Sequence, residues 1–263
     1  CTDNPVIIEN KSSSNYTNRN LLYQWSFSDG TASSSEVPDK IFTQDGPQEI
    51  ELIVHPSGIA CYDTLIRQIE VNPKPVIDVN YLDLVCQNED LAIENKSTVK
   101  NNTLTFSWDF GDSQSSKLKD PVKSYNQPGL YDIQFKAFSG EGCYAEAILP
   151  VEVKALPEIE VSYKPNACIN EAVFFDVLKP VSGKHQYNWD FDNGYTSNAQ
   201  TESVSFNNMG NYNVSLKVSD EFGCSATINS PMQVHDFPLV DFNINPECEG
   251  DVLEINNLTT VNS

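Results

Sequence analysis

Residues 106–112 read Phe-Ser-Trp-Asp-Phe-Gly-Asp, and a closely similar pattern stands at two other places in the chain. Trp108 and Phe110 alternate with polar residues, so in a strand both side chains point to one face. Asp109 then points to the other face, where its carboxylate accepts backbone N–H groups, and Gly111-Asp112 supplies a tight turn. The stretch therefore predicts a half-buried strand that ends in a hairpin turn.

This stretch belongs to an internal repeat of about 82 residues, the kind of period that marks a tandem array. Four series of marker residues recur at that spacing. They are Trp25, Trp108 and Trp189; Cys1, Cys86, Cys168 and Cys248; Cys61, Cys143 and Cys224; and Pro75, Pro157 and Pro238. The pentapeptide Ile8 to Ser12 also recurs unchanged as Ile93 to Ser97. Four independent series with one period indicate roughly three copies in tandem.

Short alternating runs within each copy predict strands with one buried face. Leu91, Ile93 and Asn95 alternate after the first Cys of the second copy, and Tyr131 and Ile133 begin a similar run before its second Cys. Turn residues separate these runs, and no segment shows a sustained helical period with caps. We expect an all-β fold of sandwich domains.

The marker series divide the chain into four parts. Residues 1–72 form a domain whose first strand is missing, 73–154 and 155–235 form complete domains, and 236–263 begin a partial fourth. Each joint is only a few residues long and contains a proline, which restricts its predecessor to extended geometry. We expect an extended rod that is a piece of a longer array.

The second copy resembles the PKD (polycystic kidney disease) repeat, whose hallmark is a W-D-F-G-D-G turn followed by Y-x-x-P-G-x-Y. After the turn already quoted, residues 125–131 read Tyr-Asn-Gln-Pro-Gly-Leu-Tyr. The third copy keeps Trp189 to Gly194 and Met209 to Tyr212, whereas Trp25 to Gly30 of the first copy has no P-G-x-Y after it. The resemblance covers the whole chain.

The resemblance implies an immunoglobulin-like sandwich in each copy, with no catalysis of its own and no cofactor. It places one aromatic pair of each turn in the core between two sheets. These pairs are Trp25 and Phe27, Trp108 and Phe110, and Trp189 and Phe191. The Cys-bearing variant looks like arrays in giant surface and secreted proteins of Bacteroidota, which include adhesins of gliding cells and multidomain secreted enzymes.

Charge excludes two classes of partner. The 263 residues carry 37 acidic and 16 basic side chains, a net charge of −21. Nucleic acids and anionic lipid surfaces both require clustered Lys and Arg. No run of 18 apolar residues is present, so direct membrane insertion is not expected. An acidic coat of this kind keeps an exposed protein soluble and unaggregated.

Seven Cys at repeating positions predict structural disulfides in an oxidising compartment, outside the cell or on its surface. Pairing within each copy would join Cys1 to Cys61, Cys86 to Cys143 and Cys168 to Cys224. In an immunoglobulin-like copy, however, the two Cys lie at opposite ends, some ~20 Å apart, and a bridge needs Cα atoms within ~7 Å. Pairing across the joints is preferred, with the within-copy scheme left open. The preferred scheme joins Cys1 to Cys143 and Cys86 to Cys224, while Cys61, Cys168 and Cys248 pair outside residues 1–263.

The sequence contains few residues that could form a catalytic or metal-binding site. The nearest carboxylate pairs are Asp109 with Asp112 and Asp190 with Asp192, and each is explained by a capped hairpin turn. They remain weak candidates for Ca²⁺, which prefers oxygen ligands. No Ser-His-Asp or Cys-His arrangement and no phosphate-binding glycine motif occurs. We expect no enzyme activity and no catalytic residue.

These observations favour a structural protein. The first hypothesis is a stalk segment of a giant bacterial cell-surface adhesin, which holds a distal binding region away from the cell and bears tension. The alternative is a spacer or polysaccharide-binding array of a secreted multidomain enzyme. The expected partners are neighbouring repeats of the same chain, together with extracellular polysaccharide or other surface proteins.

Overall fold

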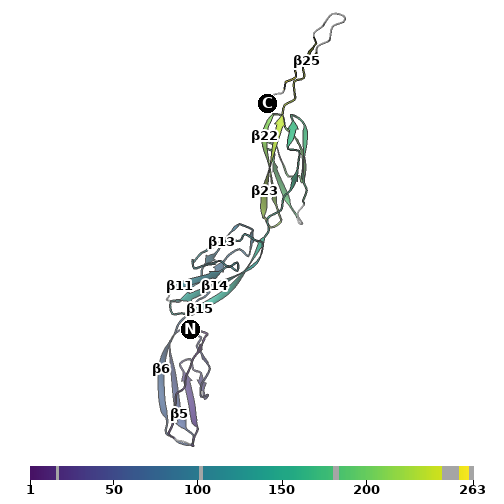
Figure 1. Ribbon diagram of the computed structural model, residues 1–263. Helices are drawn as coiled ribbons and strands as arrows, with labels where there is room; N and C mark the ends of the chain where they lie inside the picture. Colours follow the sequence, from purple (N-terminus) through teal and green to yellow (C-terminus); the bar gives the residue numbers. More distant parts are fainter. Residues whose placement is uncertain (16–17, 101–102, 180–183, 245–254, 261–263) are drawn as a thin grey trace, which may run out of the picture. The chain divides into compact units, whose positions relative to one another are not determined.

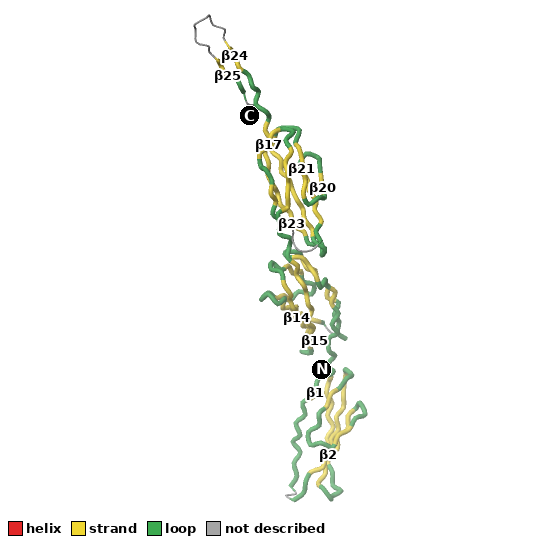
Figure 2. Tube along the Cα trace, turned by 90° about the vertical axis from the view of Figure 1, so that its right-hand side faces the viewer, coloured by secondary structure: helices red, strands yellow, loops and turns green. Residues whose placement is uncertain are grey.

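The computed structural model describes residues 1–15, 18–100, 103–179, 184–244 and 255–260, and these residues form strands and loops without a helix (Figures 1 and 2). The all-β prediction is confirmed. The chain divides into two compact units. Unit 1 is Cys1–Val85, Asp90–Ser124 and Leu130–Glu152; unit 2 is Cys86–Glu89, Tyr125–Gly129 and Val153–Ser263. Among the described residues there is no helix of the length and apolar character needed to cross a membrane.

The first repeat, in unit 1, is built on a four-stranded sheet of order β3-β2-β5-β6. Its strands are β2 (Leu21–Phe27), β3 (Ala32–Ser33), β5 (Gly46–Pro56) and β6 (Asp63–Val71). A short antiparallel pair, β1 (Pro5–Val6) with β4 (Lys40–Ile41), lies outside this sheet. Trp25 and Phe27 project from β2 into a core that also contains Phe42, Ile50, Leu52 and Val71.

The second repeat has a five-stranded sheet of order β12-β11-β14-β15-β8. Its strands are β8 (Leu84–Cys86), β11 (Leu104–Asp109), β12 (Ser115–Ser116), β14 (Gly129–Ser139) and β15 (Tyr144–Lys154). Two further pairs are β7 (Val79–Asn80) with β10 (Glu94–Asn95), and β9 (Asp90–Ala92) with β13 (Val122–Ser124). Compared with the first repeat, the main sheet gains the strand β8, which ends at Cys86, the first Cys of the second repeat.

The third repeat, in unit 2, has a five-stranded sheet of order β17-β23-β22-β19-β20 and a three-stranded sheet of order β16-β18-β21. The first contains β17 (Asn166–Cys168), β19 (Gln186–Asp190), β20 (Thr196–Ser197), β22 (Gly210–Ser219) and β23 (Ser225–His235). The second contains β16 (Val161–Ser162), β18 (Ala172–Val177) and β21 (Thr201–Ser205). A hairpin of β24 (Phe242–Ile244) and β25 (Ile255–Asn257) follows.

The turn quoted first is built alike in all three repeats. Trp25, Trp108 and Trp189 are buried, and the indole Nε1 of each donates to the carbonyl ten residues later, at 2.9 Å in every case. Phe27, Phe110 and Phe191 are buried beside them. Because each indole has a polar partner, the large ring is buried without an unpaired N–H group. The alternation of aromatic residues therefore places these six side chains as expected from the sequence.

Candidate functional site: the cysteine turns and their bridges

The segment Cys86 to Glu89 forms a tight turn at the end of β8. The carboxylate Oε2 of Glu89 accepts the N–H of Cys86 at 3.1 Å, and the N–H of Glu89 donates to the carbonyl of Cys86 at 3.0 Å. The N–H groups of the two central residues bond to residues outside the turn: Gln87 donates to Lys154 O and Asn88 donates to Tyr125 O, both at 2.8 Å. Asn88 has a φ of 64°, a left-handed conformation that Asn tolerates. These bonds fix the direction of Cys86.

Cys86 is bonded to Cys224, which lies in the hairpin between β22 and β23. The Cα atoms of this disulfide are 5.5 Å apart. Asp220 holds the hairpin, because its Oδ1 accepts the N–H groups of Phe222 at 2.9 Å and of Cys224 at 2.8 Å. The Nζ of Lys154 lies 4.1 Å from the centroid of the Phe222 ring, a cation–π contact next to the bridge. Both partners of this bridge are in unit 2.

A second bridge, within unit 1, joins Cys1 to Cys143, with Cα atoms 5.6 Å apart. The Cys1 turn is anchored by Thr2, whose N–H donates to Asn72 O at 3.0 Å and whose Oγ1 accepts the N–H of Lys74 at 3.1 Å. Cys143 is fully buried in the hairpin between β14 and β15. This bridge therefore covers the segment 72–74, which connects the first and second repeats.

The two bridges are the pairs of the across-joint scheme, and Cys1–Cys61, Cys86–Cys143 and Cys168–Cys224 are not bonded. Both bonds have ordinary Cα separations. Cys61, exposed, and Cys168, half-buried, are free thiols in the structure. Cys248 lies outside the described residues. Pairing of these three with further repeats stays a prediction.

Cys168 occupies a turn with the same bonds as the Cys86 turn. The N–H of Cys168 donates to Glu171 Oε2 at 2.9 Å, and the N–H of Glu171 donates to Cys168 O at 3.0 Å. Asn170 has a φ of 63°, as Asn88 has a φ of 64° in the second repeat. The N–H of Ile169 donates to His235 O at 2.9 Å. The hydrogen bond from Lys164, followed by that from the Cys168 N–H, lowers the pKa of Glu171. The third turn is thus formed without its bridge.

The four carboxylates weighed as Ca²⁺ ligands serve as caps of the turn. Asp109 Oδ1 accepts the N–H of Gly111 at 3.0 Å, and Asp190 Oδ1 accepts the N–H of Asp192 at 3.0 Å. Asp192 Oδ2 accepts a backbone N–H from β22 at 3.0 Å. Asp112 Oδ1 caps the N–H two residues later at 3.1 Å. Across the described part of the chain, no three His, Cys, Asp or Glu side chains form a group suited to a metal ion.

A family model described as "PKD domain" matches residues 1–70, 72–153 and 154–234. The chain belongs to the PKD domain family. A curated relative is the pre-pro-metalloprotease PrtV of Vibrio cholerae serotype O1, which is 22% identical over 169 residues. The match includes 62% of this chain but only 18% of PrtV, so the chain spans less than a fifth of that relative.

Two solved structures are single PKD domains. The PKD1 domain of Vibrio anguillarum Epp is 22% identical, with a TM-score of 0.29, over 32% of this chain and 98% of that one. The PKD1 domain of the Vibrio cholerae metalloprotease PrtV is 20% identical, with a TM-score of 0.27, over 32% and 99%. Each solved domain matches about one PKD repeat of this chain.

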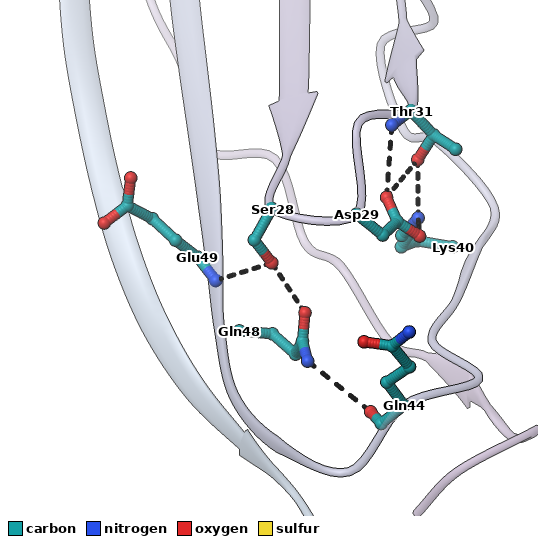
Figure 3. A network of polar contacts seen from close by, with 7 residues as sticks. All are labelled: Ser28, Asp29, Thr31, Lys40, Gln44, Gln48 and Glu49. Carbon is teal, nitrogen blue, oxygen red and sulfur yellow. Dashed lines mark hydrogen bonds and ion pairs between the residues drawn. The ribbon is translucent and has the colours of Figure 1, made fainter.

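A buried ion pair supports the turn in the first two PKD repeats, and the sequence analysis missed it. Lys123, only 4% exposed in its side chain, donates to Asp112 Oδ2 at 2.5 Å. Lys40 is 6% exposed in its side chain and pairs with Asp29. Figure 3 shows Asp29, Thr31 and Lys40 in mutual contact, with the Ser28–Gln48 contact nearby. A lysine placed inside a sandwich carries a desolvation penalty unless it is paired.

Acid should weaken the first PKD repeat through Asp29. The hydrogen bonds from Lys40 and then Thr31 lower the pKa of Asp29 from 3.8 to about 2. A carboxyl group with a lowered folded-state pKa stabilises the fold above its unfolded value, and that contribution disappears as the pH falls from about 4 to 2. Urea denaturation followed by Trp25 fluorescence, with Trp108 and Trp189 replaced by Phe, measures it. Asp29→Asn should lose less stability over this interval, and an equal loss in both proteins would contradict the assignment to Asp29.

Proposed function

We propose that the chain is a structural stalk segment of a giant bacterial cell-surface adhesin, of the kind made by gliding Bacteroidota. It holds a distal binding region away from the cell and bears tension. The observation that carries this proposal is the pair of interleaved disulfides, because Cys86 of the second bridge lies between Cys1 and Cys143 of the first. Disulfides of this kind persist in oxidising surroundings, which favours an extracellular location.

Interleaved bridges limit how far the chain extends under load. With both intact, the shortest covalent path from Cys1 to Cys224 crosses to Cys143, returns to Cys86 and crosses again. Its chain portion is about 57 residues (143 minus 86), or about 190 Å fully extended at ~3.4 Å per residue. Without bridges the path is about 223 residues (224 minus 1), or about 760 Å. The bridges therefore keep an unfolded segment from lengthening about fourfold.

Single-molecule pulling between attachment points beside Cys1 and Cys224 tests this role. The oxidised chain should extend by no more than about 190 Å between these residues, and reducing agent should raise the limit to about 760 Å. A Cys86→Ala variant keeps only the first bridge and should reach an intermediate limit. Equal extension with and without reducing agent would contradict the mechanical role.

The alternative is a non-catalytic spacer, or a polysaccharide-binding array, within a secreted multidomain enzyme. The similarity to PrtV supports it, since that relative is named a metalloprotease and matches over only 18% of its length. Neighbouring repeats remain the expected partners under both proposals. Deleting residues 73–154 from the complete parent protein distinguishes them: a stalk should lose binding under flow while static binding survives, whereas an enzyme should change in turnover of its substrate.

A further inference from the structure

The outer face of the main sheet of the third repeat carries a polar groove. The groove has a volume of about 570 Å³ and lies on β19 and β22, with Asn198, which follows β20, at its side. Lys217 stands directly opposite Asn188 on the two strands, and Ser219 stands opposite Gln186. These side chains alternate with buried residues of the same strands, so they point away from the core. The volume is within the range of ~300–1,000 Å³ that is usual for small-ligand sites.

The polar side chains of this groove are not used within the repeat. Among the described residues, no hydrogen bond engages the three side-chain amides of the groove, those of Gln186, Asn188 and Asn198. The described lining includes Lys217 but no Asp or Glu, although acidic residues outnumber basic ones by 37 to 16 in the chain. The acidic residues closest along these strands, Asp190 and Asp220, both cap backbone N–H groups of turns. The groove therefore combines a positive charge with free amide donors and acceptors.

The second repeat has a lysine at the same position, but its charge is neutralised within the repeat. Lys136 of β14 corresponds to Lys217 of β22, because each directly follows the residue opposite the buried Trp of its repeat. The Nζ of Lys136 lies 2.9 Å from Glu146 Oε2 and 5.6 Å from the centroid of the Tyr144 ring. The first repeat has Ile53 at this position and no charge.

The third repeat lacks both partners that Lys136 has in the second. Thr227, opposite Lys217 on β23, stands three residues after the hairpin Cys, where the second repeat has Glu146. Ser225 stands directly after that Cys, in the place of Tyr144. Within the described residues, Lys217 is exposed and forms neither an ion pair nor a contact with an aromatic ring. Of the three repeats, the third therefore presents an unpaired ammonium group beside unpaired amides.

We propose that this groove binds a hexuronate unit of an acidic extracellular polysaccharide. The Lys217 ammonium pairs with the sugar carboxylate, and the amides of Gln186 and Asn188 exchange hydrogen bonds with the ring hydroxyls. The net charge of −21 repels an anionic polymer elsewhere, so it approaches where the lining has no acid. An acidic protein segment would satisfy the lysine but would offer no hydroxyls to the amides. The inference rests on the polysaccharide-binding form of the proposed function and names its ligand class.

Titration of the full chain with tetragalacturonate, followed by heteronuclear NMR, tests the site. We expect the signals of Asn188 and Lys217 to shift, with an affinity that falls as salt is added, because the ion pair is exposed. Lys217→Gln should weaken binding about fivefold, the upper end for one exposed ion pair. Thr227→Glu, which gives Lys217 the partner that Lys136 has, should weaken it as well. Both positions are exposed, so the melting temperature should not change.

Lys136→Gln is the matched control, because that lysine is already paired, and this variant should bind like the parent. The methyl ester of tetragalacturonate keeps the hydroxyls without the charge and should not bind. Equal binding of the ester or of a polyglutamate peptide, equal affinity of the two lysine variants, or no shift at any soluble concentration would overturn the proposal. Binding that stays unchanged in Lys217→Gln and shifts signals of another repeat would refute this groove while leaving a polysaccharide-binding array supported. The stalk role is tested separately by pulling on one molecule.

Discussion

Replacing Asp112 by alanine should lower the unfolding free energy of the second PKD repeat by about 3 kcal/mol, since it leaves the buried Lys123 ammonium without its counter-ion. Lys123 is 4% exposed in its side chain, whereas Asp112 is 20% exposed. Gln114 Oε1 still accepts from Lys123 at 3.0 Å, which holds the loss near the lower end of the range for a broken buried pair. The alanine also removes the cap on the Gln114 N–H.

The third repeat supplies the control for this experiment. At the positions of Asp112 and Lys123 it has Asn193, whose Oδ1 caps the Tyr195 N–H at 3.0 Å, and Val204, which is buried. The double variant Asp112→Asn with Lys123→Val copies this arrangement and should stay within about 1 kcal/mol of the parent, because hydrophobic replacement of a buried pair is often neutral. Native-state hydrogen exchange of peptides from β11 and β14 measures both. If the double variant loses as much as Asp112→Ala, the ion pair is not the cause.

The fold was predictable because its signals are local and repeated. Trp108 and Phe110 alternate along one sequence stretch, and the same alternation occurs around Trp25 and Trp189. The buried face of this strand can therefore be predicted independently in three copies. The structure buries the Trp ring and the Phe ring of all three turns. The direction of Asp109, away from the core and onto the Gly111 N–H, also follows from alternation alone.

The buried lysines were not predictable by the same reasoning. A lone Lys in an alternating run is normally taken as exposed, and its burial depends on a carboxylate eleven residues away along the chain. The signal appears only when the copies are compared with one another. Asp112 and Lys123 of the second copy are both replaced in the third copy, by Asn193 and Val204.

Removing the bridge between Cys86 and Cys224 is expected to lower the unfolding free energy of the third PKD repeat by about 4 kcal/mol. When that repeat unfolds beside a folded second repeat, the bridge closes a loop of roughly 70 residues, and the chain-entropy model gives this value for such a loop. Cys86→Ala is the suitable change, because Cys86 is half-exposed whereas Cys224 is fully buried. The variant removes the bond with little loss of packing.

Cys168→Ala is the matched control, because Cys168 occupies the same type of turn, with the same Glu contact, but carries no bond. It should change the stability by less than about 0.5 kcal/mol. Hydrogen exchange of β22 and β23 peptides reports the third repeat. Reducing agent should bring the parent close to the level of Cys86→Ala and change that variant little. Because turn and packing are alike in the two alanine variants, a similar small loss in both would mean that the cross-link does not stabilise the repeat, and a similar large loss would assign the effect to the turn.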